Sequence, residues 1–158
     1  MKLKPRLHAI GAATTAVLLA GFWSATAISE LFLSLEAVAL VKQVVAFAVF
    51  GLALSMATTA ITGISMARKG SLPLLQKKRQ RMPFIAFNGV AILIPSAIFL
   101  SLRATADRFD TWFYIVQGIE LVVGAINITL IALNIRDGLR LRERRTAATA
   151  HLHPSKRT

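Results

Sequence analysis

Five polar or small residues recur along one apolar stretch in the C-terminal third of the chain. They are Gln117, Glu120, Gly124, Asn127 and Asn134, at intervals of three, four, three and seven residues. This spacing places all five on one face of an α-helix. A carboxylate in a lipid bilayer costs about 3 kcal/mol on insertion scales. We therefore expect this face to point toward protein or water rather than lipid.

Two kinds of chemistry fit this polar stripe, which we define as Gln117, Glu120, Asn127 and Asn134. In the first, the amides hydrogen-bond between membrane helices for about 0.6–2 kcal/mol each, and Gly124 lets a neighbouring helix approach. In the second, Glu120 belongs to a proton or ion path, because intramembrane acids often mark such paths. We favour the first interpretation and keep the second as the alternative.

Three residues outside the stripe are candidate partners for it. Judged by depth along the helices, Asn88 should contact Asn134. Lys42 lies about one to two turns from Glu120. We expect its long stem to extend toward the lipid headgroups, with an ion pair to Glu120 as the alternative. His8 is expected to form a hydrogen bond at a helix end, with a haem or quinone contact as the alternative.

Other common chemistries have no support in the sequence. The chain contains no cysteine, which excludes disulfides, thiolate metal sites, iron–sulfur clusters and cysteine nucleophiles. It also lacks the G-x-S-x-G, H-E-x-x-H and P-loop patterns. We therefore predict no catalytic residue, no metal site and no cofactor, and we expect a protein that is not an enzyme.

Four long apolar stretches must position these residues. They are Leu7–Ser29, Ala37–Ala67, Met82–Leu102 and Thr111–Ile135, and each has the roughly 20 residues that a helix needs to cross a bilayer. The second stretch is too long for one upright crossing. Either it tilts, or residues 37–43 protrude and residues 44–64 cross, which is the simpler interpretation. The third should begin after Pro83 and be locally loosened at Pro95. Leu72, Leu74 and Leu75 suggest a short surface-lying segment before it.

The positive charge is distributed unevenly between the connections. The N-terminus, the segment between the second and third stretches, and the C-terminal segment hold 16 of the 19 lysine and arginine residues. Short basic segments remain cytoplasmic. The pattern predicts an all-α bundle of four transmembrane helices, built from two helical hairpins, with both termini in the cytoplasm. The net charge of +12 is then explained by contact with anionic lipid headgroups, without nucleic acid.

The sequence predicts one domain and a tail. Residues 1–145 should form the four-helix transmembrane domain, and residues 146–158 a flexible basic cytoplasmic tail. Small residues at alternating intervals of four and three in the second stretch indicate a helix-packing seam, which could also serve a homo-oligomer or a larger membrane complex. The seam consists of Gly51, Ser55, Thr58, Thr62 and Ser65.

Several short strings carry a resemblance. They are Phe22-Trp23-Ser24, Ser29-Glu30-Leu31-Phe32, Arg81-Met82-Pro83-Phe84 with Asn88-Gly89, Gln117-x-x-Glu120-Leu121, and Asn134-x-Arg136-Asp137-Gly138-Leu139. Together they resemble an uncharacterised family of small four-span bacterial inner-membrane proteins, over most of the chain. None of the strings is a chemical motif. The resemblance implies a bacterial inner membrane and carries no activity.

For function, the sequence favours a non-enzymatic accessory or scaffold subunit that packs in a homo- or hetero-complex. A small transporter or proton-coupled membrane component that uses Glu120 is the first alternative. A redox subunit that holds haem or a quinone near His8 is the second.

Overall fold

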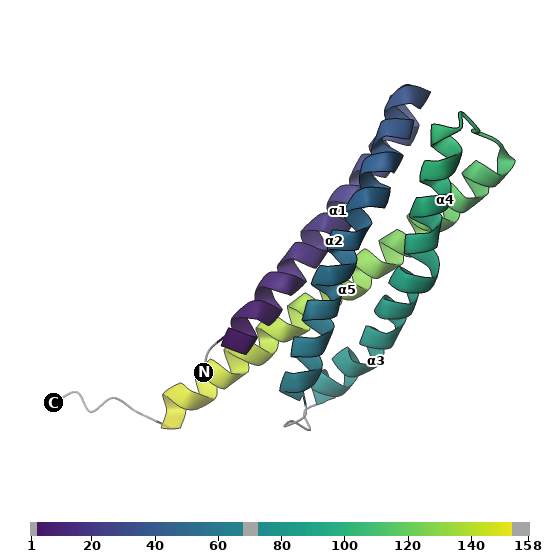
Figure 1. Cartoon of the computed structure of the whole chain (residues 1–158). Coiled ribbons are helices and arrows are strands. Elements are labelled where there is room, and N and C mark those ends of the chain that lie inside the picture. Colours follow the sequence, from purple (N-terminus) through teal and green to yellow (C-terminus); the bar gives the residue numbers. More distant parts are fainter. Residues whose placement is uncertain (1–2, 68–72, 153–158) are drawn as a thin grey trace.

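The described part of the chain folds into four long helices, one of them irregular. The computed structural model describes the backbone of residues 3–67 and 73–152, and the side chains of residues 6–62 and 80–140 (Figure 1). The elements are α1 (Leu3–Phe32), α2 (Leu35–Ala67), α3 (Pro73–Phe87), a π-helical segment η1 (Asn88–Leu93), α4 (Ile94–Thr105) and α5 (Thr111–Leu152). Because α3, η1 and α4 follow without a break, they form one continuous helix.

All four helices are long and apolar enough to cross a membrane, as the sequence predicts. The candidate spans are Arg6–Phe32, Leu35–Thr62, Gln80–Thr105 and Thr111–Arg140. Many large apolar side chains face outward, among them Phe47, which is 84% exposed. An outer surface of this kind suits acyl chains and is unfavourable in water. The predicted all-α fold of a four-helix, multi-pass membrane protein is confirmed.

The helices form two hairpins that share their ends. Helix α1 turns back into α2, and α4 turns back into α5, which runs diagonally behind the other helices (Figure 1). We call the end with these two turns the acidic end, because Glu36, Asp107 and Asp110 lie there. The opposite end carries Arg6 and Arg81, and we call it the basic end.

Local hydrogen bonds set the turn between α1 and α2. The Ser34 hydroxyl accepts a hydrogen bond from the backbone N–H of Ala37 at 3.4 Å, which is how a serine N-cap satisfies the first turn of a helix. The Leu33 N–H donates to the carbonyl of Ser29 at 3.1 Å. The two helices therefore become antiparallel neighbours within two linking residues.

The end of α4 has the two backbone hydrogen bonds of a Schellman motif. The N–H of Arg108 donates to the carbonyl of Arg103 at 2.9 Å, and that of Asp107 to the carbonyl of Ala104 at 3.2 Å. The motif needs a residue with positive φ, usually glycine. Here Asp107 takes that conformation at φ 54°, which aspartate tolerates better than most residues.

The third span differs from its sequence-based description. Pro83 lies inside α3 rather than before the span. Of the predicted surface-lying segment, Leu74 and Leu75 belong to α3, which leads straight into η1, and Leu72 lies outside the described residues. In η1 the N–H of Ile94 donates to the carbonyl of Gly89, five residues earlier. Pro95 follows at once, and because a proline has no N–H, the regular ladder cannot continue through it. The wider turn accommodates this loss, as π-bulges commonly do at such points.

Helix α5 is longer than the apolar stretch that predicts it. It continues to Leu152, so the predicted domain boundary at residue 145 does not coincide with a helix end. Residues 146–152 of the predicted flexible tail are helical. Residues 153–158 lie outside the described part of the chain.

Asp110 caps the first turn of α5, and we expect this cap to make the stability of the protein decrease at acidic pH. Its Oδ1 accepts the N–H of Phe113 at 3.1 Å. This backbone hydrogen bond, together with the Arg103 charge, lowers the pKa of Asp110. Because the pKa is lowered, the stabilisation by ionised Asp110 is fully present at pH values above the ordinary pKa of aspartate. It is lost as the pH falls through the lower pKa of Asp110 in the folded state. Unfolding midpoints measured across that range should fall in the wild type and stay flatter in Asp110→Asn, which keeps the capping oxygen. Equal acid dependence in both proteins would contradict this.

Candidate functional site

A cluster of charged and polar side chains lies between α1, α2 and α5 near the acidic end. At its centre is Lys42 of α2, only 1% exposed. Its ammonium donates to Glu120 Oε2 at 3.0 Å and also to Gln117 Oε1. Glu30 of α1 is the third neighbour, with Oε1 at 3.8 Å from Lys42 Nζ. We call these four residues the charge cluster.

Lys42 therefore does not extend toward the headgroups, and that expectation is wrong. Its ammonium stays inside the bundle because two carboxylates and an amide oxygen surround it there. A buried lysine without such partners would carry a large desolvation cost. The alternative interpretation of the sequence, an ion pair between Lys42 and Glu120, is the arrangement that the structure shows.

On the side of the charge cluster nearer the basic end, the indole ring of Trp23 packs between α1 and α5. The indole N–H of Trp23 donates to the carbonyl of Leu121 at 2.8 Å. A Cβ added at Gly124 would lie only 2.9 Å from Trp23 Cδ1. Gly124 thus admits a close approach, as membrane helix interfaces often require. Trp23 thus joins α1 to α5 at this point.

A pair of amides forms the next layer toward the basic end. The side-chain amide of Asn88 donates to Asn127 Oδ1 at 3.2 Å, and Asn127 donates onward to the carbonyl of Ile85 at 3.3 Å. Asn88 therefore contacts Asn127. The prediction from depth along the helices, a contact with Asn134, is wrong. Asn134 is seven residues beyond Asn127, about 10 Å along the helix, and the π turn that begins at Asn88 changes the register of the facing helix.

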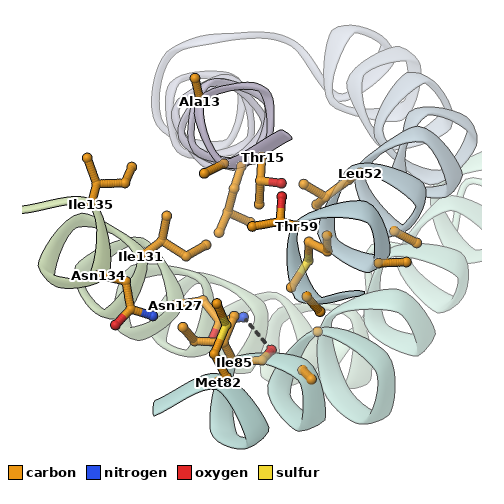
Figure 2. A pocket seen from close by; sticks show the side chains of 18 of the residues that line it. Ala13, Thr15, Leu52, Thr59, Met82, Ile85, Asn127, Ile131, Asn134 and Ile135 are labelled. Carbon is orange, nitrogen blue, oxygen red and sulfur yellow. Dashed lines mark hydrogen bonds between the residues drawn. The ribbon is translucent and has the colours of Figure 1, made fainter. Parts of the chain in front are cut away.

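An apolar cavity of about 490 Å³ occupies the half of the bundle nearer the basic end. Figure 2 shows side chains from α1, α2, α3 and α5 around it. Its polar lining includes Asn134, which is 6% exposed. The Oδ1 atom of Asn134 has no hydrogen-bond partner within the described residues. The cavity extends to Met82 and Leu139, so it reaches the basic end.

An ion pair closes the bundle beside the cavity. Arg81 donates to Asp137 Oδ2 at 2.8 Å, and the side chain of Asp137 is only 3% exposed. Arg136 lies on the other side of the same carboxylate, with Nε at 3.6 Å from Oδ1. The pair connects the start of the third span to the end of the fourth.

The predicted packing seam on α2 lies partly at the α1–α2 interface. The Ser55 hydroxyl is 2.9 Å from that of Thr15, and His8 Nδ1 lies 3.2 Å from the Thr62 hydroxyl. A Cβ on Gly51 would instead meet nothing within 4 Å. The hydroxyl of Thr58 bonds back to Leu54 O within its own helix. Ser65 lies outside the residues whose side chains are described.

His8 connects α1 to α2. Besides its contact with Thr62, its Nδ1 lies 3.1 Å from the carbonyl of Thr59. His8 therefore has the hydrogen-bond contact expected near a helix end, here with the neighbouring helix α2. Among the described residues, no group of three or more histidine, cysteine, aspartate or glutamate side chains could hold a metal ion.

Sequence reasoning missed two members of these sites. The first apolar stretch, Leu7–Ser29, ends just before Glu30, but Glu30 lies in α1, seven residues after Trp23 and on the same helix face. Asp137 was read only as part of a resemblance string. The spacing of Trp23, Thr26 and Glu30 at three and four residues is a signal that could have placed Glu30 inside the bundle.

Comparisons of the chain with protein-family models, with curated proteins and with solved structures gave no match. The function must therefore be inferred from the geometry of the sites.

Proposed function

We propose that this chain is a non-enzymatic membrane protein that binds an anionic lipid, with one acyl chain in the cavity and the headgroup at the basic end. Such a protein would act as an accessory component of a bacterial inner membrane, with both termini in the cytoplasm. The cavity between the helices carries the proposal. Its volume of about 490 Å³ lies within the range of ligand sites, and an apolar lining with few polar groups is typical of them.

The charge around the cavity selects the class of lipid. Arg6, Arg136 and Arg140 are exposed at the basic end, where Met82 and Leu139 line the cavity. Each basic residue near a membrane surface favours anionic lipid by about 1 kcal/mol. The unused Oδ1 of Asn134 offers a hydrogen-bond acceptor to a hydroxyl of the lipid. A fully apolar occupant would leave that oxygen unsatisfied.

Filling the cavity should displace the lipid. Ala53 and Leu54 are neighbours on α2, but Ala53 lines the cavity, whereas Leu54 is 71% exposed. We expect Ala53→Phe to lose about tenfold or more in affinity for an anionic phospholipid, because its ring occupies the volume that the acyl chain needs (1.4 kcal/mol is tenfold). Leu54→Phe adds a ring on the outer surface and should bind like the wild type.

The measurement is native mass spectrometry of protein purified in mild detergent and titrated with lipid. Phosphatidylglycerol and phosphatidylcholine with identical chains would be compared. The proposal requires tighter binding of the anionic lipid and a loss in Ala53→Phe alone. Equal binding of both lipids, or equal binding by the two variants, would overturn it.

A further inference from the structure

The charge cluster contains two carboxylates but only one ammonium. Glu30 and Glu120 are only 14% and 13% exposed, and Lys42 is 1% exposed. With both acids ionised, this partly buried site would carry a net charge of −1. Charges within membrane helices are costly unless they are paired. One proton bound to one carboxyl would make the cluster neutral.

The geometry distinguishes the two carboxyls. Glu120 accepts a hydrogen bond from Lys42 at 3.0 Å. Glu30 stands 3.8 Å from the same nitrogen, and its Oε1 has no hydrogen-bond partner within the described residues. A carboxylate held by an ammonium at hydrogen-bond distance is better stabilised than one without a donor. Lys42 and Glu120 are therefore the fixed pair.

Gln117 gives an independent indication that the cluster takes a ligand. It is 4% exposed, and its Oε1 must face Lys42, because an ammonium can only donate. This leaves the Nε2 donor of Gln117 without an acceptor among the described residues. Gln117 and Glu30 share Lys42 as a neighbour, and a buried unused donor and a buried unused acceptor in one cluster suit a water molecule that carries a proton to the site.

We propose that Glu30 is an exchangeable proton-binding site, supplied from the aqueous phase at the acidic end. Glu30 is two residues from the end of α1 at Phe32, so it is close to that surface. Hydronium transfers one proton to the Glu30 carboxylate, and a carboxylic acid and water result. The charged groups that act on the Glu30 carboxyl are Lys42 from α2 and Glu120 from α5. Gln117 from α5 joins them through its hydrogen bond with Lys42. At the same end, Arg103 and Asp110 pair with each other.

This site goes beyond the lipid binding proposed above, and it moves the titrating role from Glu120 to Glu30. It gives the proton-coupled alternative a specific group to test. Lipid binding in the cavity does not require it, so the two proposals can fail separately.

Infrared difference spectroscopy during a pH titration of the full chain in nanodiscs tests the site. We expect a carbonyl-stretch band from a protonated carboxyl in the wild type. The band should be lost in Glu30→Gln and should remain in Glu36→Gln, the matched control, whose exposed acid lies at the same end. Glu30→Gln keeps the Lys42–Glu120 pair, and an unchanged unfolding midpoint would show that it folds.

A second pair of variants identifies the group without removing a carboxyl. Glu30→Asp should shift the frequency of the band, whereas Glu120→Asp should leave the frequency in place. Persistence of the band in Glu30→Gln, a frequency shift in Glu120→Asp alone, or the absence of any such band in the wild type would overturn the proposal.

Discussion

Lys42→Met is expected to destabilise the bundle by about 3–5 kcal/mol, the usual cost of removing one partner from a buried ion pair. The substitution leaves Glu120 and Gln117 without the donor that they share, at a position where the lysine itself is only 1% exposed. Unfolding by a denaturing detergent, followed by circular dichroism, would measure the loss.

Arg103→Met is the matched control for Lys42→Met. It removes the same charge at the acidic end, but its partner Asp110 is exposed to solvent at 46%. Exposed ion pairs contribute little to stability, so the control should stay close to the wild type. If both variants lost the same stability, Lys42 would not occupy a buried pair.

Gly124→Leu should cost about 1–3 kcal/mol, the usual penalty for inserting carbon atoms into a packed interface. The new Cβ would lie 2.9 Å from Trp23 Cδ1, so the indole must move and its hydrogen bond to the carbonyl of Leu121 must break. Gly118→Leu on the same helix is the control, because a Cβ there meets nothing within 4 Å.

Trp23 itself can report this change. In a Trp112→Phe background, the fluorescence of Trp23 should change in Gly124→Leu and stay constant in Gly118→Leu, with unfolding midpoints following the same order. A stable Gly124→Leu protein with unchanged fluorescence would show that α1 and α5 do not meet at this point.

The helices were predictable from the sequence because apolar length and charge asymmetry are strong, local signals. The third span was less predictable, since only the structure reveals how the π turn at Asn88 accommodates Pro95. That turn changes which side chain faces the fourth span. Asn88 therefore meets Asn127 rather than Asn134, which depth along straight helices could not anticipate.

The sequence predicts the α5 members of the charge cluster but not the inward position of Lys42 or the contribution of Glu30. The spacing of Gln117 and Glu120 indicates a shared helix face, but whether Lys42 points inward depends on where α1 lies. Glu30 comes from that helix, and its contribution makes the interior favourable for the ammonium. The cavity was not predictable, because it depends on how the helices diverge and not on any motif.

A double-mutant cycle on Lys42 and Glu120 tests most directly whether a buried ion pair holds these helices together. Free energies of unfolding would be measured for Lys42→Met, Glu120→Gln and the double variant. If the pair is real, the double variant loses less than the two single losses combined, with a coupling of about 0.5–3 kcal/mol. Losses that add within about 0.3–0.5 kcal/mol would mean that the two side chains do not interact, and the charge cluster would have to be abandoned.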